Sequence, residues 1–101
     1  TALMVAARTG HERVVDLLIR HGAEVNLHSS IGTALMLAAN YGHERVVDLL
    51  IRHGADVNLQ RSDGGTALIL AANKGQARVV ELLILHGAEI NLQSSDGSTA
   101  L

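Results

Sequence analysis

The stretch TALMLAANYGHERVVDLLIRHGADVN, at residues 33–58, decides the fold because it occurs three times with small changes. TALMVAARTGHERVVDLLIRHGAEVN fills residues 1–26, and TALILAANKGQARVVELLILHGAEIN fills residues 66–91. The copies start 32 and then 33 residues apart, and Thr99-Ala100-Leu101 repeats the opening 33 residues later. A fixed period of this length is typical of a solenoid, in which similar units stack in a row.

The repeat period also sets the domain organisation that we expect. A chain of 101 residues fits one domain, so we predict a single domain over 1–101. Its units are expected at 1–32, 33–65 and 66–98, with 99–101 as the start of a fourth. The first two units are nearly identical, which fits either a recent duplication or a consensus design.

Each unit predicts two short helices. In the second unit, the Thr33 hydroxyl can cap a helix over 34–40, and Gly42 can end it in the left-handed conformation. A second helix is expected from about His43 to His53, because its apolar residues recur at the i, i+3 and i+4 spacing. Gly54 ends this helix in the same way.

The rest of the unit predicts a loop and a solvent-exposed helix face. Residues 55–65 are rich in turn-forming residues and have no helical period, so we expect an extended, hairpin-like finger. Asp48 and Arg52 are four residues apart on the polar side of the second helix and can form an ion pair.

The two helices differ in side-chain size, and this predicts how the units stack. The first helix contributes Ala38 and Ala39, whereas the second is rich in Val and Leu. The first helices should therefore approach one another more closely, so that first helices and fingers line a hollow side. One short helix pair buries too little apolar surface alone, and its neighbours must complete the core.

Gly32 to Asn58 closely resembles an ankyrin repeat, through the Leu-Ala-Ala-x-x-Gly-His, Val-Val-x-Leu-Leu and Gly-Ala-Asp-Val-Asn segments. The resemblance covers the whole chain. It implies an all-α ankyrin-repeat solenoid, made of stacked helix-turn-helix pairs with extended finger loops. It also implies a non-catalytic protein-protein interaction module that binds a protein partner on its hollow, concave face. Within this family the Gly-His pair bonds between repeats, and Gln76 replaces that His in the third unit.

The chain departs from the family pattern in two places. The family usually has Thr-Pro-Leu-His where this chain has Thr-Ala-Leu-Met or Thr-Ala-Leu-Ile, so the family's Thr–His hydrogen bond is missing. The first finger is one residue shorter than the second, and Ile31 stands where later units have Asp63 and Asp96. We expect the tip of this finger to be displaced relative to the others.

Composition and motifs argue against several function classes. The net charge of −2 gives no basic surface for nucleic acid, and no apolar stretch approaches the roughly 20 residues of a membrane span. The absence of cysteine excludes thiolate metal sites and favours an intracellular, cytoplasmic protein. His11-Glu12 and His43-Glu44 lack the second His of a zinc motif, and His21, His53 and His86 lie one repeat apart, too far for shared coordination. We therefore predict no enzymatic activity, no metal and no cofactor.

The remaining candidates are positions that vary between units at one helix end and at the finger tips. On the resemblance, these positions lie side by side on the hollow face and contact the partner. They are Arg8, Thr9, His28, Ser30, Ile31, Asn40, Tyr41, Gln60, Arg61, Ser62, Asp63, Asn73, Lys74, Gln93, Ser95 and Asp96. Tyr41 is the expected anchor, because tyrosine offers a large contact area at low entropic cost.

Two alternatives remain open at this stage. The variation can be neutral drift at exposed sites. The chain can also be a structural or self-assembling segment, since both end units have the same apolar helices as an internal unit and present no polar cap. Such uncapped ends predict either a homo-oligomer formed by end-to-end association or further repeats on either side of this sequence.

Overall fold

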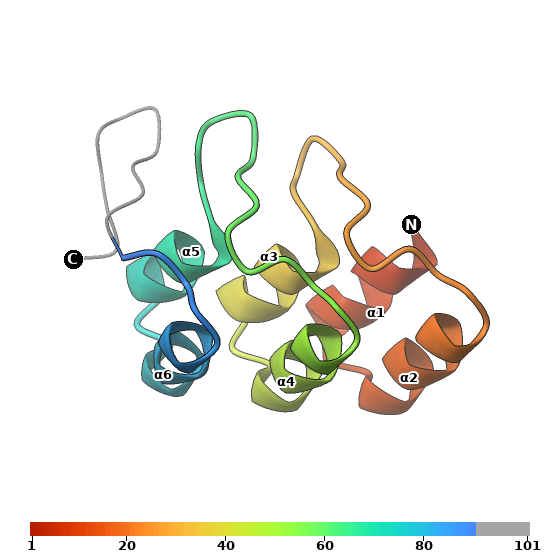
Figure 1. Ribbon diagram of the computed structural model, residues 1–101. Coiled ribbons are helices and arrows are strands. Elements are labelled where there is room, and N and C mark those ends of the chain that lie inside the picture. The colour runs from red at the N-terminus through yellow and green to blue at the C-terminus, as the bar shows by residue number, and fades with distance from the viewer. Residues whose placement is uncertain (91–101) are drawn as a thin grey trace.

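A computed structural model describes residues 1–90, and over this range the chain is all-α, with six helices in stacked pairs. Figure 1 shows the pairs in a row, with the fingers rising on one side. The helices are α1 (Ala2–Thr9), α2 (Glu12–Arg20), α3 (Ala34–Asn40), α4 (Glu44–Arg52), α5 (Ala67–Asn73) and α6 (Ala77–Leu85). The predicted fold class is confirmed. The third finger and the start of the fourth unit lie outside the described residues.

The ends of the helices follow the predicted capping pattern. The Thr33 hydroxyl accepts a hydrogen bond from the Met36 amide at 3.3 Å, and Thr66 does the same for Ile69 at 3.2 Å. Gly42 has φ +74° and Gly54 has φ +93°, left-handed values that favour glycine after a helix. Each helix therefore begins and ends within about one residue of where the sequence places it.

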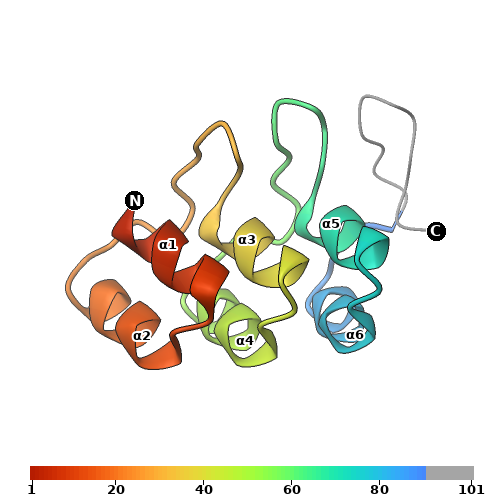
Figure 2. The same ribbon diagram turned by 180° about the vertical axis from the view of Figure 1, so that it is seen from behind.

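The helices form two rows of different character. Figures 1 and 2 show α1, α3 and α5 in one row and α2, α4 and α6 in the other. Contact along the first row is more extensive than along the second. Ala38 and Ala39 of α3 are fully buried there, which supports the argument that small side chains allow this approach. One aliphatic core runs through all three units.

Hydrogen bonds from side chains join each unit to the one before it. The His43 ring nitrogen Nε2 lies 2.8 Å from the Arg8 carbonyl oxygen at the end of α1. Gln76 Nε2 donates to the Asn40 carbonyl at 3.3 Å in the next junction. The bonding role that the resemblance implied for this His, and its replacement by Gln, are both confirmed.

A second set of links between units comes from the side chains of two asparagines. Asn26 donates to the Gly54 carbonyl at 3.0 Å and accepts from the Asp56 amide at 2.7 Å. Asn58 makes the same two bonds with the next unit, at 3.2 Å and 2.8 Å. Each asparagine therefore holds the loop that leaves the following second helix.

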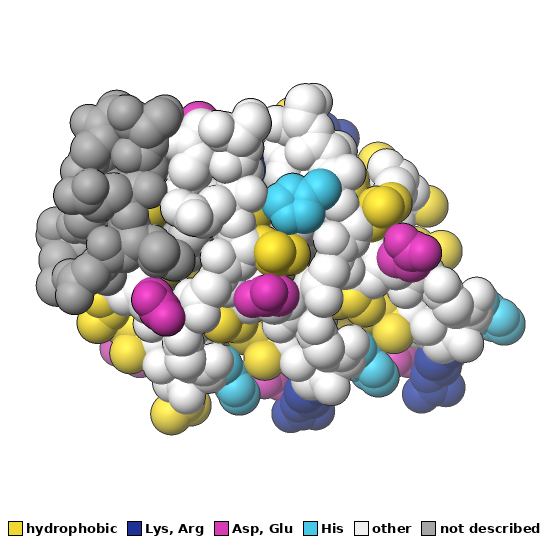
Figure 3. Space-filling model, turned by 45° about the horizontal axis from the view of Figure 1, so that its top comes forward, with side chains coloured by type: hydrophobic (Ala, Val, Ile, Leu, Met, Phe, Trp, Pro, Cys, Tyr) yellow, Lys and Arg dark blue, Asp and Glu magenta, His cyan; other side chains and the backbone are white. Residues whose placement is uncertain are grey.

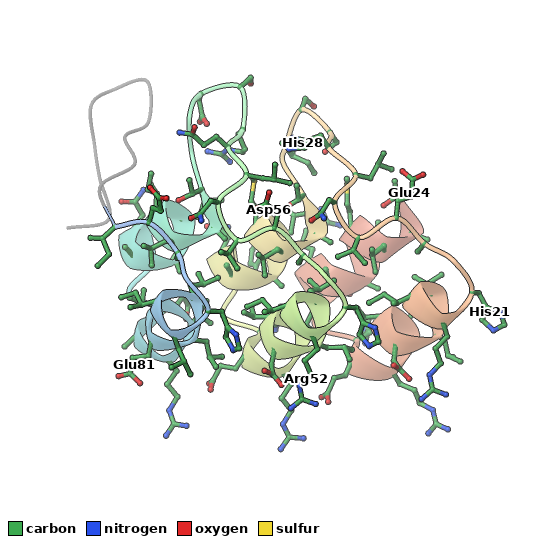
Figure 4. All side chains as sticks on the ribbon, viewed as in Figure 1. His21, Glu24, His28, Arg52, Asp56 and Glu81 are labelled. Carbon is green, nitrogen blue, oxygen red and sulfur yellow. The ribbon has the colours of Figure 1, made fainter. Side chains whose placement is uncertain are left out.

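The second row, made of α2, α4 and α6, carries charged side chains on the side away from the fingers. Arg52 and Glu81 project from this edge of α4 and α6 (Figure 4). The predicted Asp48–Arg52 ion pair is present at 2.9 Å, and Asp16–Arg20 repeats it in α2 at 3.1 Å. Both arginines are largely exposed, so each pair adds only about 0.3–0.5 kcal/mol.

Candidate functional site

The inner face, formed by the first-row helices and the fingers, is hollowed at the first unit. A groove of about 230 Å³ lies between α1, the first finger and α3. We call it the inner groove. Its lining residues are Thr1, Met4, Val5, Arg8, Ser29, Ser30, Ile31 and Leu37.

The inner groove has an apolar floor with polar groups at its edge. Val5 and Ile31 are both about half exposed, at 53% and 51%, although they are large aliphatic side chains. The Arg8 side chain lies at the end of α1 next to them and is also exposed. Such a surface can receive an apolar side chain from a partner and offer a cation to a carboxylate or carbonyl beside it.

The first finger owes its shape to a tight closure below its tip. Ser29 and Gly32 exchange two backbone hydrogen bonds of 3.0 Å, which leaves Ser30 and Ile31 at the turn. Gly32 has φ +113°, and a Cβ at this position would collide with the sulfur of Met36. At this turn Ile31 is half exposed and lines the inner groove.

The second finger closes through a different set of hydrogen bonds. The Arg61 amide bonds the Gly65 carbonyl at 2.8 Å, and the Asp63 carboxylate accepts from the Gly65 amide at 2.9 Å. Arg61 also holds Asp63 through two guanidinium hydrogen bonds, at 3.2 and 2.8 Å. The Gly65 amide and then the Arg61 guanidinium hold the pKa of the Asp63 carboxyl below its ordinary value.

Arg61 was predicted to contact a partner, and in the structure it makes contacts within the protein. Besides its pair with Asp63, its aliphatic carbons lie 3.3 Å from the place where a Cβ on Gly32 would stand. Its side chain is only 27% exposed. Arg61 therefore connects the second finger to the base of the first.

The predicted positions at the helix ends form a separate group. Tyr41, which follows α3, is 52% exposed, and Asn73 and Lys74 are exposed at the end of α5. The Thr9 hydroxyl bonds the Val5 carbonyl within α1 at 2.8 Å, so it is already engaged. Asn40 is half-buried and gives its carbonyl to Gln76. Tyr41 and Lys74 are the members of this group best placed for a partner.

The structure thus distributes the predicted site over several places. It brings Arg8, Ser30 and Ile31 together in the inner groove. Exposed His28 belongs to the first finger (Figure 4), and Gln60, Ser62 and Asp63 lie on the second. The predicted Gln93, Ser95 and Asp96 lie outside the described residues.

Three apolar members of the groove were not predicted as site residues: Met4, Val5 and Leu37. Val5 and Leu37 occupy the same position in the first two units and are among the few residues at which these units differ. That difference between the units could have indicated a binding position. An apolar residue on an apolar helix face is normally expected to be buried, so these two positions were not predicted.

The surface around the fingers is mostly uncharged. In Figure 3 the backbone and uncharged polar side chains, both white, cover most of the described fingers, with a histidine and apolar side chains between them and acidic side chains below them. Lysine and arginine side chains show mainly at the opposite edge of this view, with one further patch beside the fingers. The surface of the described fingers therefore offers mainly hydrogen-bonding and apolar groups.

Other kinds of site were sought over the same part of the chain. Within residues 1–90, no three His, Asp or Glu side chains come close enough to hold a metal ion. None of the helices described there has the length and apolar character needed to cross a membrane.

Comparison with known proteins identifies the family. No curated protein gives a significant match to the chain. A family model described as "Ankyrin repeats (3 copies)" matches residues 1–61 and 35–101, which together span the whole sequence. With this match, and with helix pairs stacked in the same period, the chain belongs to the ankyrin repeat family.

Proposed function

We propose that this chain is a non-catalytic module that binds a protein partner on its inner face. Ankyrin repeats are generally protein-interaction modules and are typically not catalytic. The single observation that carries the proposal is the inner groove, where Val5 and Ile31 remain half exposed beside Arg8. Because the chain contains no cysteine, a reducing cytoplasmic setting suits it.

The partner contributes an extended segment with at least one bulky apolar side chain. That side chain fills the inner groove, and Arg8 binds a carboxylate or carbonyl next to it. Tyr41 packs against the continuation of the segment at the end of α3, since a half-exposed tyrosine provides area at low entropic cost. Lys74 extends the contact at the end of α5.

A selection from a random peptide library displayed on phage tests this proposal. Peptides selected on the wild-type protein should bind the Ile31→Asp variant roughly tenfold or more weakly than they bind the wild type, because the groove then contains a charge. Tyr41→Ala and Lys74→Ala should weaken binding by smaller factors. Circular dichroism must show unchanged helix content for each variant.

Leu85 provides a matched control. It is the most exposed large apolar residue in the described chain, at 77%, and takes the sequence position of Arg52 on the outer edge. Leu85→Asp should leave peptide affinity unchanged. Retained affinity in Ile31→Asp and Tyr41→Ala, or a loss in Leu85→Asp, would refute the assignment of the inner face.

A further inference from the structure

The second finger carries a peptide bond that can rearrange without a catalyst. Asp63 is followed by Gly64 at the turn of this finger, and the Asp63 side chain is about half exposed, at 51%. An aspartate before a glycine is prone to isomerise, because glycine has no Cβ to keep its amide nitrogen away from the preceding carboxyl carbon. The bond lies in the middle of the chain, within a finger that has a described unit on each side.

The rearrangement has two steps and uses only water. The Gly64 nitrogen forms a bond to the side-chain carboxyl carbon of Asp63 and gives up its proton, while a hydroxyl leaves that carbon, so that one water molecule is released. Water then opens the resulting succinimide ring at one of its two carbonyls. One opening restores aspartate, and the other gives isoaspartate, in which the main chain runs through the side-chain carbons.

In the closed finger both reacting groups are engaged, and Arg61 is a partner of each. The Gly64 amide donates to the Arg61 carbonyl at 2.8 Å. The Arg61 guanidinium donates to both oxygens of the Asp63 carboxylate, from Nε to Oδ1 at 3.2 Å and from Nη2 to Oδ2 at 2.8 Å. The attacking nitrogen and the carboxyl under attack are therefore held by separate hydrogen bonds.

The Gly65 amide adds a further restraint on the carboxyl group. It donates to Asp63 Oδ1 at 2.9 Å and, together with the Arg61 guanidinium, it lowers the pKa of this carboxyl. Hydrogen bonds of this kind favour the charged carboxylate. The charged form reacts slowly, because an oxygen departs as water only from a protonated carboxyl. Ring closure therefore requires the finger to open locally first.

We propose that Asp63–Gly64 is a site of spontaneous isomerisation that the Arg61 side chain keeps slow. Isomerisation adds one carbon to the main chain between Arg61 and Gly65, so the 2.8 Å hydrogen bond that closes the finger between these two residues no longer forms in the same register. The Arg61 side chain then loses its carboxylate partner beside Gly32 of the first finger. This inference concerns the finger itself and does not depend on the proposed partner.

Arg61→Ala tests the proposal, because it removes the guanidinium and keeps the carbonyl of residue 61. Wild type and variant are incubated for several weeks at body temperature and mildly acidic pH. Peptide mapping with mass spectrometry then measures isoaspartate at residue 63. The variant should form it at least about threefold faster, since the hydrogen bonds to the carboxylate are gone. A synthetic peptide of residues 59–67, which has no neighbouring units to hold it, should react faster than the wild-type protein.

Ser62→Ala is the matched control, since Ser62 is exposed in the same turn and should isomerise like the wild type. The pair Asp96-Gly97 is an internal reference, in which Ser94 stands at the position of Arg61, and its rate should be the same in all variants. Circular dichroism checks that each variant is folded.

Equal rates at residue 63 in the wild type and in Arg61→Ala would overturn the proposal. A wild-type rate as fast as that of the peptide would also overturn it, because the closed finger would then give no protection. The same holds for an equal acceleration in Ser62→Ala, or for one at Asp96 as large as at Asp63, since either would show a general loosening.

Discussion

The helices α2 and α4 have the same nine residues, ERVVDLLIR, but bury them differently. Val15 is buried in α2, whereas Val46, Val47 and Leu50 are buried in α4. Because sequence and length are the same, the difference comes only from position in the stack. In this chain, burial is a property of a junction between units more than of a single helix.

The comparison separates local from non-local contributions to the fold. Both helices begin after a histidine, end two residues before a glycine and carry the same Asp–Arg pair on the outer side. These local features are enough to specify a helix. A neighbour supplies the additional burial of α4, as nearest-neighbour models of repeat proteins require.

The largest effect is expected from one substitution made in both helices. Val46→Asp places a charge in a fully enclosed junction and should lower the free energy of unfolding by about 4 kcal/mol or more. Val14→Asp makes the same change at a half-exposed position and should lower it by less than about 1 kcal/mol. Urea denaturation of both variants measures the two values. Similar losses of unfolding free energy in the two variants would contradict the difference between the two helices.

Removal of an asparagine link should have an intermediate effect. Asn26→Ala deletes both of its hydrogen bonds to the second unit, and we expect a loss of about 1–2 kcal/mol. The Asp56 amide should also exchange its hydrogen faster, because its acceptor is gone. Ser30→Ala, at an exposed position of the same finger, serves as a control and should change neither quantity. An unchanged Asp56 exchange rate would argue against the link.

A smaller effect is expected for the histidines that precede α2 and α4. His43→Ala removes the bond to the Arg8 carbonyl and should lower the free energy of unfolding by about 1 kcal/mol. His11→Ala removes a ring with no described partner and should have nearly no effect. Thermal melts of dilute protein provide the comparison. An equal loss in both variants would show that the ring acts through its own helix.

The smallest expected effect is on the pH dependence of stability, and it differs between the two fingers. The pKa of Asp63 is lowered in the folded state, so its contribution to stability is present at neutral pH. That contribution is lost as the pH falls through the lowered value. Asp63→Asn should flatten this part of the pH dependence, whereas Ile31→Asn, in the first finger, should leave its slope unchanged. Identical acid titrations for Asp63→Asn and the wild type would contradict the assigned role.

The sequence predicted most of the fold because the decisive signals are local and repeated. The Thr33 cap, the glycines after each helix and the apolar spacing all act within a few residues. The inner groove was predicted less well. Ile31 was found because it replaces an aspartate, but Val5 was missed because its exposure depends on how the first finger sits above α1. Arg61 was given a binding role although it packs near Gly32, a contact between fingers that no single unit encodes.

Hydrogen exchange tests most directly the claim that neighbouring units complete each other's core. The amides within α2 and α4 have the same intrinsic exchange rates because their sequences match, so any difference reports the structure around them. In a protein of this sequence we predict markedly faster exchange in α2 than in α4. Equal protection in the two helices would contradict the account.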